Sequence, residues 1–171
     1  TYVYAVNRWS VTGARDTERL VFCASHLEDA ASFLDPDVAE KLVTTSAMNA
    51  RDWHGVANVL NQDQVVAAYN GCLDRLEHDY ESFKGDIQRE NTDRVSLMIK
   101  TLEYHRERQL ARYGETLAKH RMNRRLNIIP AVEGKMQRVR QSIDERVLSL
   151  RQKQQISSSE GRVSAGVIRL A

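Results

Sequence analysis

Apolar side chains recur at alternating steps of three and four residues through much of the chain, and this spacing constrains the fold more than any other feature. One stripe runs from Val66 to Ile87, a second from Val95 to Leu117, and a third from Val132 to Leu150. Such spacing places the side chains on one face of an α-helix, where they pack against another helix. The pattern therefore predicts three long helices.

The first two stripes are out of phase with each other. The first member of the second stripe comes eight residues after the last member of the first, and Gly85, Asn91 and Thr92 lie near this gap. Glycine weakens a helix, and asparagine or threonine favours the N-terminal cap of one. We therefore predict that a helix over 61–90 ends here and that Asn91 or Thr92 caps the next helix.

The second and third stripes are joined by a polar, basic connection over residues 119–127. A connection of this length folds two neighbouring helices antiparallel. Residues 91–155 are therefore expected to form a long antiparallel helical hairpin with a basic tip. Arg106 interrupts the second stripe at a position where an apolar side chain is expected.

The beginning of the chain has the composition of β-strands. Residues 2–11 and 19–25 are rich in β-branched and aromatic side chains, and residues 12–17 between them are suited to a turn. These features predict a β-hairpin within residues 1–34.

A third strand is expected over residues 162–170, after a polar loop at 157–161. Two strands alone are marginally stable, and a third gives a sheet that is stable by itself. Within residues 156–171 we therefore expect a linker and a terminal strand that pairs with the N-terminal hairpin. The alternation predicts an apolar strand face that contains Val163, Ala165 and Val167.

A short helix followed by a loop is expected within residues 35–60. Asp35 is suited to the N-cap and Pro36 to the first turn of this helix. Val38 and Leu42, with Val43 beside them, are its expected apolar face.

Together these elements predict one α+β domain over residues 1–171 that is mostly helical. A long antiparallel helical hairpin accompanies a small antiparallel sheet, which the N-terminal β-hairpin and the C-terminal strand form together. The sequence begins with Thr1 rather than methionine. We therefore expect a fragment of a longer protein.

The composition, 42% hydrophobic and 28% charged residues, is that of one soluble domain. No apolar run approaches the ~18 residues that cross a bilayer, which argues against a membrane protein. Cys23 and Cys72 share no metal-ligand or redox spacing and lie in apolar settings, so we expect two reduced, buried thiols. This usage favours a reducing compartment, and we expect a cytoplasmic protein without membrane contact.

Charge is distributed unevenly along the chain. Residues 1–93 contain 8 Lys and Arg against 16 Asp and Glu, whereas residues 94–155 contain 15 Lys and Arg against 6 Asp and Glu. So large a contrast indicates either a basic surface with a polyanionic partner or contact between the two segments.

No catalytic motif is present. The sequence contains no GxxxxGK[ST] phosphate loop and no GxGxxG, HExxH, GxSxG or CxxC pattern. Its histidines share no ligand spacing, and the group of Asp74, Glu77 and His78 is typical of a solvated helix face. We therefore expect no catalytic residue, no cofactor and no metal site in this chain. The histidines are His26, His54, His78, His105 and His120.

One segment, residues 119–125, indicates a binding chemistry because it contains four permanent cations. Guanidinium groups bind phosphate oxygens bidentately, and cations so close together repel one another unless an anion is near. The alternative is a loop tip that collects unburied cations, or one that docks on the acidic residues 1–93. The candidate nucleic-acid-binding residues are Lys119, Arg121, Arg124, Arg125, Lys135 and Arg138.

The helix predicted over residues 132–150, the polar linker after it and the strand at 163–170 resemble the C-terminal end of bacterial Swi/Snf-type helicase-like ATPases, the RapA-like group. In that family the motor lobes, which bind ATP and Mg²⁺, are often followed by a paired strand, a short helix, a charged helical hairpin and a last strand. The nucleotide-binding motifs belong to those lobes, so none of the family's functional residues can be carried over to this chain.

The resemblance implies that the parent protein is a DNA-dependent ATPase and that this chain is its non-catalytic accessory region. The partners that it implies are DNA, the motor lobes of the same parent chain, or another protein. The alternative is a helical protein–protein interaction module unrelated to DNA.

Overall fold

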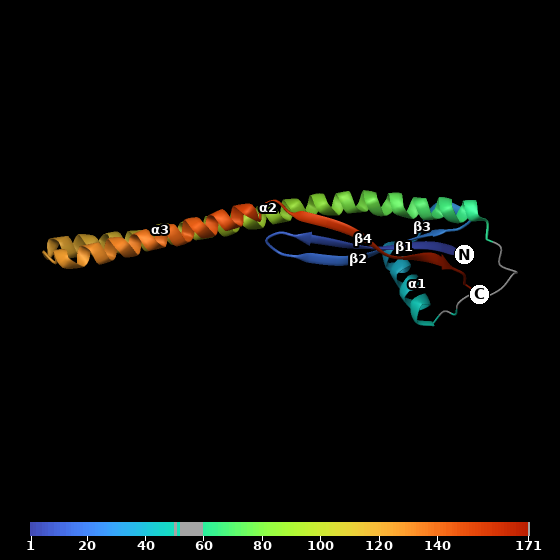
Figure 1. Ribbon diagram of the computed structural model, residues 1–171, viewed down its shortest axis with the longest axis horizontal. Coiled ribbons are helices and arrows are strands. Elements are labelled where there is room, and N and C mark those ends of the chain that lie inside the picture. The colour runs from blue at the N-terminus through green and yellow to red at the C-terminus, as the bar shows by residue number, and fades with distance from the viewer. Residues whose placement is uncertain (50, 52–59, 171) are drawn as a thin grey trace. The chain divides into compact units, whose positions relative to one another are not determined.

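A computed structural model describes residues 1–49, 51 and 60–170. The fold is mostly helical with a small antiparallel sheet, as the sequence predicts (Figure 1). The loop expected before residue 60 falls largely outside the described residues. The elements are β1 (Tyr2–Thr12), β2 (Thr17–His26), β3 (Asp29–Phe33), α1 (Pro36–Asn49), α2 (Gln62–Met122), the 3₁₀-helix η1 (Leu126–Ile128), α3 (Ile129–Gln152) and β4 (Ser157–Ile168).

The chain forms two compact units. Unit 1 contains residues 1–12, 16–86 and 157–171, and unit 2 contains residues 13–15 and 87–156. Helix α2 contributes its first part to unit 1 and its second part to unit 2. The basic segment found in the sequence, residues 94–155, belongs entirely to unit 2.

The sheet of unit 1 has the strand order β3-β2-β1-β4, and all its pairs are antiparallel. The N-terminal hairpin and its pairing with the terminal strand are confirmed, because Tyr2 lies opposite both His26 of β2 and Ile168 of β4. Strand β3 was not expected, and it pairs Phe33 with Ser25 of β2. The loop expected at residues 157–161 is wrong, because these residues form the first part of β4 and pair with β1.

A β-bulge changes which side chains of β4 face the core. Val6 of β1 lies opposite Ser164, and the next residue, Asn7, lies opposite Arg162, so Val163 has no partner across the ladder. One extra residue moves the following side chains to the other face of a strand. The apolar face expected for β4 is wrong in part: Val163 is 55% exposed and Ala165 is also exposed, whereas Val167 packs on a buried cluster that contains Val3.

Helix α1 begins where the sequence predicts but turns a different face inward. The carbonyl of Asp35 accepts hydrogen bonds from the backbone N–H groups of Val38 and Ala39. Ala39 and Val43 are buried, whereas Val38 is 50% exposed. The expected inward position of Val38 is wrong, because the small side chain of Ala39 lies against the core in its place.

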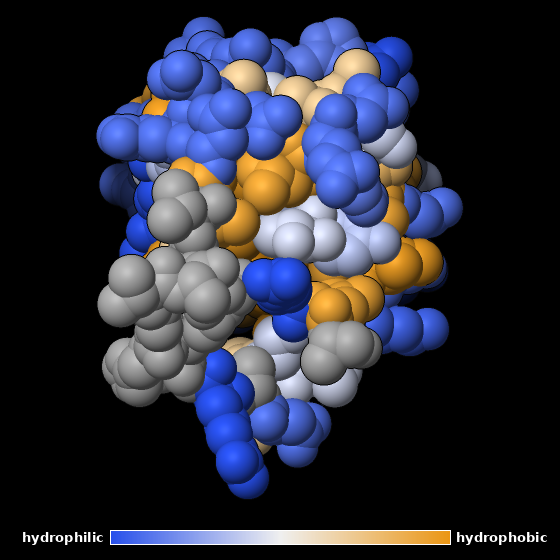
Figure 2. Space-filling view, turned by 90° about the vertical axis from the view of Figure 1, so that its right-hand side faces the viewer, coloured by the Kyte–Doolittle hydropathy of each residue, from blue (hydrophilic) through white to orange (hydrophobic). Residues whose placement is uncertain are grey.

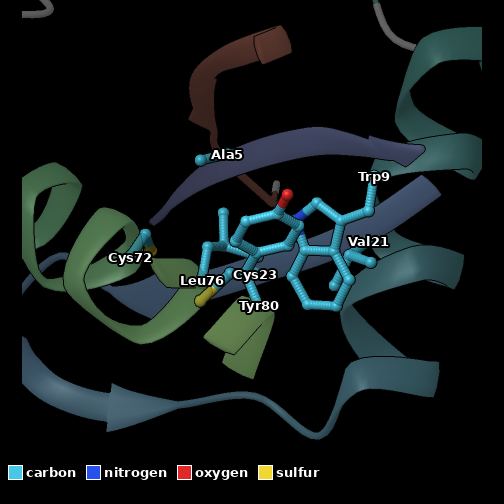
Figure 3. Close-up of a cluster of buried hydrophobic side chains, with 7 residues drawn as sticks. All are labelled: Ala5, Trp9, Val21, Cys23, Cys72, Leu76 and Tyr80. Atoms are coloured by element: carbon cyan, nitrogen blue, oxygen red, sulfur yellow. The ribbon is translucent and has the colours of Figure 1, made fainter. Parts of the chain in front are cut away.

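The core of unit 1 lies between the sheet and the first part of α2 (Figure 3). The Trp9 ring of β1 lies 5.5 Å from the ring of Tyr80 and 5.2 Å from the ring of Phe83. Aromatic rings at such distances add to the free energy gained by burial. The apolar stripe predicted for this helix is thus a packing face. The buried cluster contains Ala5, Trp9, Val21, Cys23, Cys72, Leu76 and Tyr80.

Both cysteines are free and buried in this core, as predicted. The thiol of Cys72 has two acceptors for its hydrogen within reach, the carbonyl oxygen of Val3 and Ser25 Oγ, each at 3.7 Å. The neighbouring Cys72 thiol, and then burial, raise the pKa of the Cys23 thiol. Cys23 is therefore a protonated packing residue.

The surface mixes polar and apolar side chains, and the face drawn in Figure 2 shows hydrophobic groups interrupted by hydrophilic ones. Exposed apolar groups of this kind are common on protein surfaces. No helix within residues 1–49 and 60–170 is long and apolar enough to cross a membrane.

The break predicted between the first two stripes is wrong, because α2 is one helix from Gln62 to Met122. Asn91 caps no helix start; its side chain is buried in unit 2. Its Oδ1 accepts a hydrogen bond from the Ala14 N–H at 2.8 Å, and its Nδ2 donates to the carbonyl oxygens of Lys153 and Gln154 at 2.8 and 2.9 Å. The polar residue in the gap therefore pairs with backbone groups far away in the sequence.

The same cluster explains two neighbouring residues. Gln88 Nε2 donates to the Gln154 carbonyl at 2.9 Å, and Gln88 Oε1 accepts from the Ile156 N–H at 3.2 Å. The side-chain amide of Gln88 thus forms hydrogen bonds with the backbone that follows α3. A Cβ at Gly13 would lie 2.7 Å from Asn91 Oδ1. Glycine at this turn is what allows the backbone to approach Asn91 so closely.

The hairpin of α2 and α3 is antiparallel, as predicted. Arg106 pairs with Asp144 at 2.9 Å and Arg121 with Glu133 at 3.5 Å, so positions further along α2 meet positions nearer the start of α3. Arg106, which interrupts the second stripe, extends to the exposed Asp144 and so keeps its charge near water. Two helices cover only one side of each other, so the other stripe residues are half-buried. The fully buried members of the two stripes are Val95, Leu117, Val132 and Ile143.

We predict that Asn91→Ala lowers the free energy of unfolding by about 1–3 kcal/mol, because it removes the side-chain partner of the Ala14 N–H and of the Lys153 carbonyl oxygen in a partly buried place. Urea unfolding followed by circular dichroism measures the difference. Asp93→Ala, two residues further and exposed, is the control and should differ little from the parent. An Asn91→Ala protein as stable as that control would contradict the assigned role.

Candidate nucleic-acid interface

The tip of the hairpin is built by the turn that ends α2. The N–H of Arg124 donates to the carbonyl oxygen of Arg121 at 3.1 Å, and the N–H of Arg125 donates to that of His120 at 3.0 Å. This pair of hydrogen bonds, with a left-handed residue between them, is the Schellman motif that closes many helices. Arg124 is the left-handed residue, with φ 54°.

Arg124 is an unfavourable residue for its own backbone conformation. A side chain with a Cβ in the left-handed region costs roughly 1–2 kcal/mol, and glycine, which avoids this cost, is the usual residue at this position of the motif. The tip therefore keeps a cation at a position where backbone energy favours glycine. Such a conflict between a residue and its conformation is typical of functional positions.

The cations of the tip are exposed and weakly neutralised. Every side chain from residue 121 to 127 is exposed, and so is that of Lys119. Arg121 has Glu133 at 3.5 Å, but both groups are more than half exposed, so water screens this pair. Across the residues that the structure describes, no ion pair involves Lys119, Arg124 or Arg125.

The two helix ends at the tip carry partial charges of opposite sign, and only the start of α3 is positive. The three residues Lys119, His120 and Arg121 complement the negative end of the α2 dipole. The positive end of α3 begins seven residues after Met122, and its first turn contains no acidic residue and no side-chain cap. An anion at the tip would therefore meet guanidinium groups and the positive end of a helix dipole together.

Two apolar side chains at the tip escaped the sequence analysis. Met122 is 83% exposed and Leu126 is 65% exposed, on either side of Arg124 and Arg125. Neither residue belongs to a helical stripe. An apolar residue outside the stripes was the sequence signal for exposed apolar surface at the tip. They give the tip an apolar surface beside its charges.

The structure brings four of the six candidate residues to the tip and places the other two along α3. Lys135 and Arg138 lie about 9 and 13 Å from Ile129 along the helix axis. Both are exposed. Arg138 Nε donates to the Gly134 carbonyl oxygen at 3.3 Å. These two residues are therefore a separate part of the basic surface.

A groove that was not predicted from the sequence lies between α2 and α3. It has two adjoining parts of about 520 and 410 Å³, which share Leu102 and Arg146. We call it the hairpin groove. Its most exposed apolar side chain, Leu97, lies outside the predicted stripe, and this position was the sequence signal for it.

The remaining polar candidates do not form a site. Asp74, Glu77 and His78 are spread over an exposed face of α2, and His54 lies outside the described residues. Within residues 1–49, 51 and 60–170, no three His, Cys, Asp or Glu side chains gather as metal ligands would.

The chain matches no protein-family model, no curated protein and no solved structure.

Proposed function

We propose that this chain is the non-catalytic accessory arm of a Swi/Snf-type DNA-dependent ATPase, and that the tip of its hairpin binds the phosphate backbone of duplex DNA. The observation that carries the proposal is Arg124, a cation kept in a left-handed conformation that favours glycine. The charge has to be worth more than the conformational energy that it costs.

The chemistry of the tip fits phosphate better than bases. Lys119, Arg121, Arg124 and Arg125 offer guanidinium and ammonium donors, which bind phosphate oxygens and release counterions. Tyr104, the exposed ring of this basic segment, lies about four helical turns before the tip, so the tip has no stacking platform for single-stranded bases. Contacts of this kind position a protein on DNA without reading its sequence.

The resemblance supplies the setting of the proposal. In the proposed setting, motor lobes elsewhere in the parent protein bind ATP and Mg²⁺. This chain contributes no catalytic group, and the arm acts in the cytoplasm. The rival occupant of the tip is an acidic protein surface, such as one formed by residues 1–93, which would use the same cations.

We predict that the four tip cations give DNA binding a steep salt dependence. The log–log slope of affinity against salt should be about −3 to −4, and Arg124→Ala combined with Arg125→Ala should flatten it by about 2. Electrophoretic titration of a mixed-sequence duplex from low salt upward measures both values. The control is Arg140→Ala combined with Arg151→Ala, which removes the same charge from exposed positions of α3.

Equal weakening by the tip variant and by the α3 control would show that only net charge matters, and it would contradict a tip site. No band shift at micromolar protein and low salt would contradict DNA as the partner and leave the protein-interaction alternative.

We predict opposite effects of Arg124→Gly on stability and on binding. Relief of the left-handed conformation should raise the free energy of unfolding by about 0.5–1 kcal/mol, while the lost contact should flatten the salt slope by about 0.9. Arg125→Gly is the matched control, because residue 125 has φ −87° and gains no such relief. It should lose the same binding and also lose stability. If Arg124→Gly bound DNA as tightly as the parent, Arg124 would have no phosphate role.

A further inference from the structure

The hairpin groove is a second surface that the tip does not use. Its wider part is floored by Leu97, Met98, Leu102 and Leu150, and both helices contribute to it. Leu97 is 66% exposed and Met98 is 43% exposed, so water covers apolar side chains here. A groove between two helices, with anchors spaced along it, suits an amphipathic helix. The lining residues of α2 run from Leu97 to Gln109, about 18 Å or three helical turns.

The walls of the groove have one sign of charge. Arg138 and Arg146 line it, together with the titratable His105, and none of its lining residues is acidic. Asp144 is two residues from both Ser142 and Arg146, so it lies about 160° round α3 from these two lining residues and pairs with Arg106 instead. The groove therefore presents an apolar floor with a cationic edge along α3.

This arrangement selects among possible occupants. A DNA backbone would neutralise Arg138 and Arg146 but would leave the leucine floor without an apolar partner. A second copy of the hairpin, in an interface with two-fold symmetry, would bring the arginines of both grooves together. An apolar helix face flanked by carboxylates would pack on the leucine floor and pair with the two arginines.

We propose that the hairpin groove binds an acidic amphipathic helix of about three turns from a partner protein. Its apolar face packs on Leu97, Met98, Leu102 and Leu150, and its flanking carboxylates pair with Arg138 and Arg146. This proposal does not depend on DNA binding at the tip, because it uses different residues and a different class of partner.

The test uses the full chain and two synthetic helical peptides of 14 residues. Both carry leucine at positions spaced i, i+3, i+4 and i+7, flanked by glutamate in one peptide and by lysine in the other. Fluorescence anisotropy of labelled peptide, at the ionic strength of a physiological buffer, gives the affinities. We expect saturable binding of the glutamate peptide and at least tenfold weaker binding of the lysine peptide.

Two variants locate the site, and each has a matched control. Leu97→Ser combined with Met98→Ser should weaken binding of the glutamate peptide about tenfold, and Arg146→Glu should do the same. Leu148→Ser and Arg140→Glu change an exposed leucine and an exposed arginine of α3 outside the groove, and both should stay within about twofold of the parent. Circular dichroism should give the parent's helix content for every variant, because all altered residues are exposed.

Several outcomes would overturn the proposal. They are equal binding of the two peptides, no saturation by the glutamate peptide, and equal losses in the groove variants and their controls. A self-associated chain in analytical ultracentrifugation that Leu97→Ser with Met98→Ser makes monomeric would assign the groove to a second copy. Duplex DNA that displaces the glutamate peptide from the Arg124→Ala, Arg125→Ala protein would assign it to nucleic acid.

Discussion

The amide of Asn91 is the interaction on which the architecture of unit 2 depends. It pairs with the backbone of the turn at Ala14 and with the two carbonyl groups that follow α3. Without it the Ala14 N–H and the Lys153 carbonyl oxygen would lose this partner in a partly buried place, which is costly. The amide belongs to α2, which continues unbroken to the tip. It therefore joins this helix to the turn at Ala14 and to the residues that follow α3.

The tip shows a local conflict that the rest of the hairpin does not. Its turn has the hydrogen bonds of a common helix ending, yet the residue in the left-handed conformation is Arg124 rather than glycine. Exposure of the neighbouring cations means that little in the described chain compensates their charge. Conformational strain and uncompensated charge at one place are together the argument for a bound anion.

A hairpin of two helices also explains the groove. In the hairpin each helix packs on one other helix, so only some residues of the stripes, such as Val95 and Ile143, become fully buried. Apolar side chains beside the stripe, such as Leu97 and Met98, remain at the surface because no third helix covers them. The number of helices in the bundle, and not the composition of either helix, therefore creates the second surface.

Spacing along the chain by itself determined the strands β1 and β2 and the antiparallel hairpin with its basic tip, because each depends on residues that are neighbours in sequence or on simple repeats. It also located the cations of the tip. The pairing of the last strand followed from the marginal stability of two strands alone. The left-handed conformation of Arg124 belongs to the local turn that ends α2, although no glycine marks it in the sequence. Tertiary structure alone decided that Asn91 lies within a continuous helix, that a bulge at Val163 reverses part of β4 and that α2 and α3 leave a groove. These features depend on hydrogen bonds and packing between segments up to about 160 residues apart, whose free energies exceed the local preferences that a sequence pattern reports.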